Sequence, residues 1–504
     1  MPSSEITWSL QAGWPLLAVL QLLPLVGSLV VIGLRRWALA TPVGIAFSLL
    51  EMGLASRLYG ALDLANPAMQ FAERWNLPGL LDYHAAVDGL SVLFILLTAF
   101  ISLLASLYGL VRGLAPAWRL LALILASETS LMLMFTTLNL LWFVVAAALQ
   151  VAFIGALLKG WSTSPYRDQA LKTYYKFMGT GLVLLLIGTL LLGWGHTHVR
   201  GGAWAFDLMD LRQARVGEAF QTLVFFLLFY GLAIRTPLFP FHGWLPLVAE
   251  HGNIAVGPTL LLGLKVGIYG LLRFVLPLVP QAIQQWQPFV VAFAVVGVFY
   301  AALLAMVQDD LRRMLAFAVV SHTSLIVIGL FTLDHLAFQG SVLLSVTFGL
   351  ALAALLFMTG LVFRRTQSTR LGELGGLFDP IPFVGITFLV AGLSIIGMPG
   401  TPGFDAAHLI LEASMERFGG LLTIAAALGN VLAAGFLLWA FQRAFLAPCP
   451  AGRSHADLER LGLAEWLVAG AVVLVLLGVG FYTRPWLELI EPPLAHLSAL
   501  YDRP

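Results

Sequence analysis

Two proline-rich stretches interrupt apolar segments of this chain: IRTPLFPFHGWLP at residues 234–246 and GMPGTPGF at residues 397–404. Proline lacks a backbone donor and clashes with the preceding helical turn, so neither segment can form one continuous helix. Each break has a plain interpretation as a kinked or loop-terminated helix. Matching breaks in two halves of a membrane protein are nevertheless typical of inverted-repeat transporters, whose freed helix ends line an ion path near the middle of the bilayer.

The segments around these breaks are apolar enough to cross a bilayer. Of the 504 residues, 60% are hydrophobic and 11% are charged, and a spanning helix needs about 20 mainly apolar residues. The apolar runs predict an all-α polytopic membrane protein, a single membrane domain over residues 1–504. The predicted fourteen spans are 14–34, 37–58, 88–111, 118–137, 139–161, 173–195, 219–244, 253–278, 284–307, 311–331, 338–363, 380–412, 418–446 and 461–482.

The two breaks fall in spans seven and twelve, five spans apart. We therefore expect two five-helix channel halves, residues 118–278 and residues 284–446, which repeat in inverted orientation. Loops after odd-numbered spans hold sixteen of the 27 basic residues, against nine in the loops after even-numbered spans and the C-terminus. Because short cytoplasmic loops are enriched in lysine and arginine, both termini are expected on the lumenal or periplasmic side. Arg35 and Arg36 close the first span, as in a retained helix.

Composition excludes several classes of function. The single cysteine, Cys449, excludes an intrachain disulfide and any iron–sulfur cluster ligated by this chain's cysteines alone. A net charge of +1 gives no signal for nucleic acid. We therefore expect no cofactor in this chain and place any redox centre in partner proteins.

Ionisable residues inside spans are costly and mark functional candidates. Lys265 lies near the middle of span eight, in LLLGLKVGIYGLLRF, and a buried lysine can gain and release a proton. Arg235 directly precedes the first break and is expected to act as a fixed charge, with Glu128 or a backbone carbonyl as its partner. His242, inside the same break, is either a relay group or a cap on the broken helix end.

Further candidates are ionisable residues of other spans. Glu128, in span four, is expected either to pair with a cation or to titrate. His322, in span ten, is either a structural histidine or a relay group. His408 and Glu412 follow the second break and are spaced so that they share a helix face. Asp88, before Gly89, is expected to cap the third span.

These residues lie in motifs that resemble the antiporter-like subunits of complex I, subunits of membrane-bound hydrogenases and multisubunit cation/proton antiporters. Within this superfamily, the length and the lack of a long C-terminal lateral helix resemble the M/D type, chain 4. The motifs are YHAAVDGLSVLF at 83–94, RTPLFPFHGWLP at 235–246, GLKVGIYGLLRF at 263–274, QDDLRRMLAFAVVSHTSL at 308–325 and GMPGTPGF at 397–404.

The resemblance assigns proton-pathway positions, and this chain departs from several of them. Lys265 and His322 match the family's lysine of span eight and histidine of span ten. Arg235 stands where the family has the lysine of span seven. The glutamates of spans five and twelve fall at Ala148, with Gln150 the nearest polar group, and at Ala407, beside His408.

These departures are similar to the D-type subunits of the cyanobacterial photosynthetic complex I variants that drive carbon dioxide uptake. The resemblance implies a proton-conducting subunit of an NAD(P)H- or ferredoxin-dependent, plastoquinone-reducing oxidoreductase in a thylakoid membrane. It also implies adjacent antiporter-like subunits and lipids as partners, a peripheral carbonic anhydrase-like protein, and quinone and iron–sulfur clusters in partner subunits. Two alternatives are a cation/proton antiporter subunit and a structural anchor for that peripheral protein.

Overall fold

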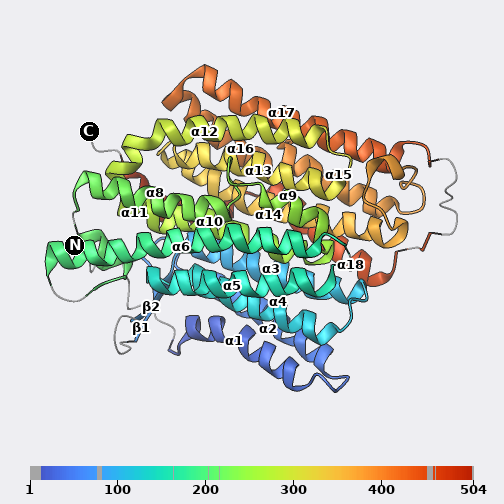
Figure 1. Ribbon diagram of the computed structural model, residues 1–504, viewed down its shortest axis with the longest axis horizontal. Coiled ribbons are helices and arrows are strands. Elements are labelled where there is room, and N and C mark those ends of the chain that lie inside the picture. The colour runs from blue at the N-terminus through green and yellow to red at the C-terminus, as the bar shows by residue number, and fades with distance from the viewer. Residues whose placement is uncertain are drawn as a thin grey trace.

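The structure is a computed structural model that describes residues 13–75, 82–162, 164–201, 204–214, 216–450, 458–459 and 461–501. Four of the basic residues used to predict the topology, Arg215, Arg453, Arg460 and Arg503, lie outside the described residues. The described chain is mainly helical, and most of its long helices run roughly along one common direction (Figure 1). This arrangement confirms the predicted all-α polytopic membrane fold.

Within the described residues, twelve helices or helical segments are long and apolar enough to cross a membrane. Each lies at a predicted span, with ends that differ by a few residues. The helices are α1 (Leu16–Gly33), α3 (Gly89–Val111), α4 (Ala117–Thr136), α5 (Leu140–Trp161), α6 (Arg167–Arg200), α8 (Glu218–Arg235), α10 (Gly257–Gly270) continued by η4 (Leu271–Val275) and α11 (Leu276–Leu278), α12 (Pro280–Met306), α13 (Leu311–Leu330), α14 (His335–Thr366), α17 (Gly420–Phe441) continued by η6 (Gln442–Leu446), and α18 (Leu463–Phe481).

The remaining two predicted spans are occupied by α2 (Ala40–Ala61) and by the pair α15 (Pro382–Ile396) and α16 (Pro402–Phe418). Both predicted breaks are confirmed. Helix α8 ends at Arg235 and α9 (Trp244–His251) resumes after the first proline-rich stretch, while α15 and α16 flank the second. The backbone groups that proline frees must find other partners inside a membrane protein, so these breaks are places where polar groups gather.

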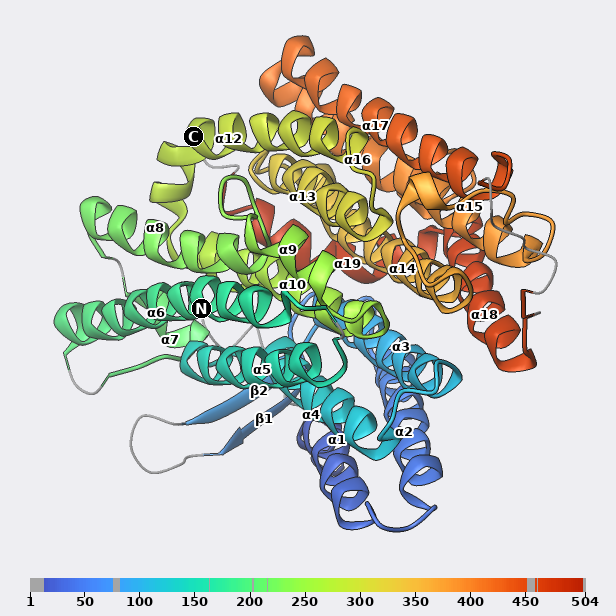
Figure 2. The ribbon, with the colours of Figure 1, turned by 45° about the vertical axis from the view of Figure 1, so that its right-hand side comes forward.

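Two elements at one end of the bundle were not predicted. Strands β1 (Gln70–Trp75) and β2 (Tyr83–Val87) form an antiparallel hairpin, which Figure 2 shows projecting beside α4 and α5. The carboxylate of Glu73 on β1 accepts hydrogen bonds from the backbone N–H groups of Leu17 and Ala18, at 2.7 and 3.1 Å. The hairpin therefore caps the first turn of α1, whose N–H groups lack partners within the helix.

A short amphipathic helix, α19 (Arg484–Ser498), follows the last span and packs on α3 and α14. Gly89, the first residue of α3, lies against the backbone of α19 so closely that a Cβ there would overlap the carbonyl group of Leu489. The smaller elements are α7 (Leu208–Gln213), η3 (Ile254–Val256) and η5 (Leu371–Glu373).

The centre of the molecule is formed by α10, α13 and α14. The apolar segment that contains α10 is completely buried, whereas about a quarter of the residues of α17 and α18 are buried. The N-terminal helices α1 and α2 lie at the opposite side of the bundle from α17 in both views (Figures 1 and 2). Any internal polar path therefore lies along the central helices, and the outer helices face lipid or neighbouring proteins.

Candidate functional site

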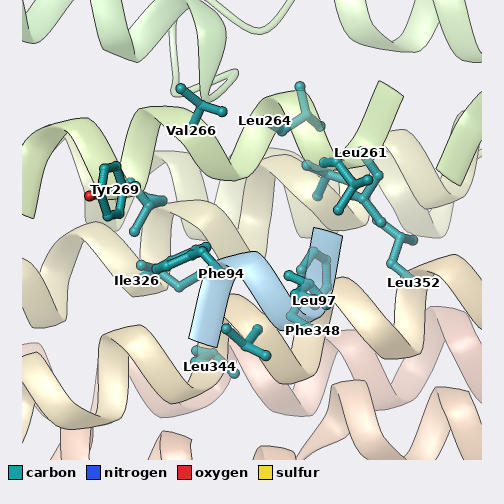
Figure 3. Close-up of a cluster of buried hydrophobic side chains, with 14 of the residues drawn as sticks. Phe94, Leu97, Leu261, Leu264, Val266, Tyr269, Ile326, Leu344, Phe348 and Leu352 are labelled. Atoms are coloured by element: carbon teal, nitrogen blue, oxygen red, sulfur yellow. The ribbon is translucent and has the colours of Figure 1, made fainter. Parts of the chain in front are cut away.

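Lys265 lies in the middle of α10 and is buried, with 3% of its surface exposed. Its ammonium nitrogen lies over the ring of Phe348 on α14, 4.8 Å from the ring centre. Phe348 belongs to the cluster of buried hydrophobic side chains in Figure 3, to which α3 contributes Phe94 and Leu97 and α10 contributes Leu264. A cation–π contact is attractive where the cation has lost water, so Phe348 partly replaces the solvent of Lys265.

His322 on α13 stacks on the same ring of Phe348, with ring centres 4.8 Å apart and an interplanar angle of 10°. Both ring nitrogens face backbone carbonyls: Nδ1 is 3.2 Å from the oxygen of Ala318 and Nε2 is 3.1 Å from that of Ile395. Carbonyls only accept, so a proton on either nitrogen finds a hydrogen bond. Ile395 lies in the last turn of α15, and His322 thus links Lys265 to the second break. The prediction that both side chains point to the protein interior is confirmed.

Arg235 ends α8 at the first break and is buried. Its Nη2 donates to Oε1 of Gln150 at 2.7 Å, its Nε donates to the carbonyl of Gly263 at 3.1 Å, and its Nη1 donates to that of Ala147 at 3.4 Å. Arg235 was expected to bind Glu128 or a backbone carbonyl, and the carbonyl alternative is confirmed. A planar guanidinium matches such a fan of acceptors, so the group is held rigidly between α5 and α10.

Gln150 connects this arginine to a further helix. Its amide nitrogen donates to Oγ of Ser127 on α4 at 3.4 Å. Glu128, the next residue, is fully buried, but neither of its carboxyl oxygens has a hydrogen-bond partner within the described residues. Glu128 is buried in the interior, as predicted, but it forms no hydrogen bond with Arg235.

His242 is buried in the first break. Its ring lies near those of Phe239, Tyr300 and Phe317, with centres 5.9, 5.3 and 6.2 Å away. Its Nδ1 has no hydrogen-bond partner within the described residues. The structure therefore places His242 in an aromatic pocket between the break and α12, and both interpretations, relay group and helix cap, stay predictions.

His408 and Glu412 lie on one face of α16, as their spacing predicts, but this face is exposed. The buried face of α16 carries Ala406, Ala407 and Ile410 instead. The structure therefore does not bring His408 and Glu412 to Lys265 and His322. Their part in a proton path stays a prediction for a route along the edge of this subunit.

A buried polar cluster at the far end of α10 was missed in the sequence. Nη2 of Arg273 pairs with Oδ1 of Asp88 at 2.6 Å, and its Nε donates to the hydroxyl of Tyr269 at 3.2 Å. That hydroxyl donates to the carbonyl of Phe135 at 2.9 Å and lies 3.0 Å from Oγ of Ser91. The signal was the spacing of four between residues 265, 269 and 273, which places all three on one helix face.

Asp88 also accepts from the backbone N–H of Ser91 at 3.0 Å, which confirms it as the cap of α3. Asp88 and Arg273 line a cavity of about 290 Å³, together with residues 67–69 before β1 and residues of α7 and α19. His496 and Arg212 contribute further polar atoms to its wall. The cavity begins two helical turns beyond Lys265, so α10 carries polar groups from the middle of the bundle to its end.

Helices α10 and α17 end in the same unusual way. Each passes into a π-helical turn, Leu271–Val275 in one and Gln442–Leu446 in the other, and each turn contains an arginine, Arg273 or Arg443. π-helical turns are rare and occur frequently at functional sites. The two turns lie five spans apart, and Gly435 stands eight residues before Arg443, where α10 has Lys265. The repeat of 118–278 in 284–446 stays a prediction.

Comparison with known proteins gives consistent matches. The profile of the family described as NADH:quinone oxidoreductase/Mrp antiporter, TM, matches residues 136–433. Subunit M of the NADH-quinone oxidoreductase of Escherichia coli is 28% identical over 511 residues, covering 96% of this chain and 97% of that protein. Chain 4 of the NAD(P)H-quinone oxidoreductase of Gloeobacter violaceus is 28% identical over 506 residues, covering 97% and 94%.

Solved structures share the fold over nearly the whole chain. A chain of respiratory complex I from Thermus thermophilus superposes with a TM-score of 0.86 at 27% identity, covering 97% of this chain and 100% of that one. A chain of the Mrp complex from Dietzia sp. superposes with a TM-score of 0.84 at 20% identity, covering 96% and 98%, which shows the fold alone. The family match covers more than half of the sequence and includes Lys265, His322 and Arg235. This integral membrane protein therefore belongs to the NADH:quinone oxidoreductase/Mrp antiporter transmembrane family.

Proposed function

We propose that this chain is a proton-conducting, antiporter-like membrane subunit of a complex I-type quinone-reducing oxidoreductase. The observation that carries the proposal is the contact of Lys265 and His322 with one ring, that of Phe348, at the centre of the bundle. Two buried groups that can each bind a proton thereby contact the same aromatic ring. Electrons pass through partner subunits, which hold the quinone and the iron–sulfur clusters.

Each residue of the site has a different role in the proposed proton path. Lys265 can release its proton, and His322 can take up or give a proton at either nitrogen while keeping a carbonyl partner. Arg235 stays charged and supplies a fixed positive field beside α10. Tyr269 and the pair of Arg273 and Asp88 extend the polar side of α10 to the cavity at the end of the bundle, where water can complete the route.

A finer part of the proposal concerns the kind of oxidoreductase. We infer that it is the variant coupled to carbon dioxide hydration and uptake, in a cyanobacterial thylakoid membrane, with plastoquinone as acceptor and a peripheral carbonic anhydrase-like partner. The support is the replacement of a lysine and glutamate pair by Arg235, Ala148 and the neutral Gln150. An arginine bound to an amide and two carbonyls cannot exchange a proton with its partner, so this half of the chain suits an outlet for protons released by hydration.

The test is Lys265→Met in the complete complex. Loss of a positioned proton-transfer group lowers rates by on the order of a hundredfold or more, so carbon dioxide uptake should fall by that order while other complexes reduce quinone normally. Lys159→Met, which changes an exposed lysine at the end of α5, is the matched control and should leave uptake unchanged. Full uptake by an assembled Lys265→Met complex would favour the alternative function of a structural anchor.

A second candidate function, a subunit of a multisubunit cation/proton antiporter, is favoured by the likeness of the fold to the Mrp complex chain. The two functions differ in their dependence on sodium. In vesicles that contain the purified complex, proton movement by a quinone-reducing subunit should follow quinone reduction and ignore sodium. Proton movement that needs a sodium gradient and no electron donor would identify the antiporter.

A further inference from the structure

Two carboxyl groups without partners are buried between α2 and α4. Glu51 lies in the middle of α2 and Glu128 in the middle of α4, and both side chains are 0% exposed. None of their four carboxyl oxygens has a hydrogen-bond partner among the residues that the structure describes. Helices α2 and α4 pack on one another. A buried polar group without a partner is rare in a native protein and needs an explanation.

The packing of the helices shows that the two groups lie at the same depth. Helices α2 and α4 run parallel, because α3 crosses back between them, and Gly44 of α2 packs against Leu121 of α4. Glu51 and Glu128 each follow those positions by seven residues, which is about two helical turns on the same face. The pair therefore sits near the middle of the membrane, on the side of α4 that faces α2.

A hydroxyl group without a partner lies at the same level. Oγ of Ser48 on α2 is 3.4 Å from Oγ of Ser106 on α3, which fixes the register of these two antiparallel helices. Ser102, one turn before Ser106, is consequently level with Glu51. Its buried Oγ also has no partner within the described part of the chain. Three helices thus direct five oxygen atoms without partners toward one depth in the bundle.

Among the described elements that pack on α2 and α4, each basic group is exposed or has another contact. Helices α1 and α3, which pack on α2 and α4, carry no charged residue within their bounds, and the arginines of α2 and α4, Arg57 and Arg119, are exposed. The remaining ionisable groups on the described elements that pack on α2 or α4 are Tyr59, Tyr83, His84, Tyr108, Lys159, Lys265 and Tyr269. Tyr83 stacks on Trp75. His84 pairs with Asp207, Tyr108 and Tyr269 bond to carbonyls, Tyr59 stacks on Trp486, Lys159 is exposed and Lys265 contacts Phe348.

Two ionised carboxylates cannot be buried together without a compensating charge, since the desolvation cost and their mutual repulsion add. A proton on a carboxyl group removes its charge and turns one oxygen into a donor for the neighbouring carboxyl or for Ser102. We propose that Glu51 and Glu128 form a proton-binding site, separate from the path of Lys265, that holds at least one proton at neutral pH. Ser127, adjacent to Glu128, accepts a hydrogen bond from Gln150 of α5. Helix α5 also binds Arg235 through the carbonyl of Ala147, so it connects this site to Arg235.

The test is infrared spectroscopy of the complete complex in lipid. The wild-type complex should show the carbonyl stretch of a buried protonated carboxyl group, and the band should shift in heavy water as the proton exchanges. The double variant Glu51→Gln/Glu128→Gln should lose this band, because an amide keeps the shape without the acid. Glu412→Gln, which changes an exposed carboxyl group on α16, should keep it. The infrared band does not depend on transport. The band can therefore be absent while Lys265 conducts protons as proposed, and it can be present if Lys265 does not.

Thermal stability gives a second measurement if the double variant assembles poorly. An amide mimics a protonated carboxyl group, so Glu128→Gln alone should unfold at the temperature of the wild-type complex. Identical spectra for the wild-type and double variants would overturn the proposal. So would a protonated-carboxyl band that appears in the wild-type complex only when sodium is removed, since the two carboxylates would then bind a metal cation.

Discussion

Arg235 shows how one residue decides what a site can do. Its guanidinium reaches a side-chain amide and two carbonyls on different helices, and all three bonds depend on its planar fork. The sequence showed the arginine and its position before a proline. It did not show the acceptors, because two of them are backbone carbonyls, which every residue carries, and their orientation depends on how α5 and α10 pack.

Arg235→Lys should therefore destabilise the complex. A lysine is a compact charge on a flexible stem and cannot reach the three acceptors together, so the loss should be about 1.5–3 kcal/mol, the range for a hydrogen bond to a charged group. The thermal midpoint of the purified complex measures this. Arg417→Lys, at an exposed arginine of α16, is the control. An unchanged midpoint for Arg235→Lys would show that the fork geometry contributes nothing.

Adding a carboxylate opposite that lysine should not help transport. In the variant Ala148→Glu/Arg235→Lys, a protonatable pair would exist between α5 and α8. This pair would restore the family pattern from which the sequence departs at these two positions. If this half of the chain is an outlet that works with a fixed charge, carbon dioxide uptake should stay level or fall. An increase in uptake over the wild-type complex would contradict the outlet hypothesis.

At the scale of elements, the spans could be predicted because each is a long apolar run bounded by charges or turn residues. The breaks at 234–246 and 397–404 could be predicted because proline acts locally. Helix α19 was missed since it is short, amphipathic and carries Pro492 and Pro493 inside it, which read as a helix stop. The hairpin β1–β2 was missed because its six- and five-residue strands are too short to stand out between apolar spans.

The contact of α8 with α10 depends on a glycine. A Cβ at Gly267 would overlap Oγ1 of Thr236, directly after Arg235, and would also press on the carbonyl of Leu232. Gly267→Ala should push the two helices apart, displace the first break and lower the yield of assembled complex. Gly179→Ala on α6, where a Cβ meets nothing within 4 Å, should assemble normally. Equal yields, measured by native gel electrophoresis of solubilised membranes, would show that the helices can shift at no cost.

For the whole molecule, the sequence predicted the order of the helical segments but not which helices are central. Twelve of the fourteen predicted spans are occupied by helices long and apolar enough to cross a membrane within the described residues. Helices α10 and α17 both lie in long apolar segments, yet the segment of α10 is completely buried and only about a quarter of the segment of α17 is buried. Inside a bilayer the hydrophobic pattern no longer separates the two faces of a helix, because lipid and protein interior are equally apolar. The interior positions of Lys265 and His322 could nevertheless be predicted, because exposing an ionisable side chain to the bilayer is costly.

The topology remains a prediction at this scale. An even number of spans and the excess of basic residues in loops after odd-numbered spans place both termini on the lumenal or periplasmic side. A C-terminal tag should therefore resist a protease added to the cytoplasmic side of sealed vesicles and become cleavable after detergent is added. Immediate cleavage in sealed vesicles would mean that the chain crosses the membrane an odd number of times or in the opposite orientation.

The central position of α10 has a consequence for biosynthesis. Ribosomes make the chain from its N-terminus, so α10 leaves the ribosome before α13 and α14 exist. Lys265 consequently enters the membrane without Phe348, at a stage when an ammonium group in the bilayer costs about 2.5–3.5 kcal/mol on insertion scales. The newly made helices α3, α4 and α8, which contact α10 in the finished protein, are the protein surfaces available to shelter it. The first eight spans must therefore stay together at the site of insertion until the second half of the chain arrives to enclose the lysine.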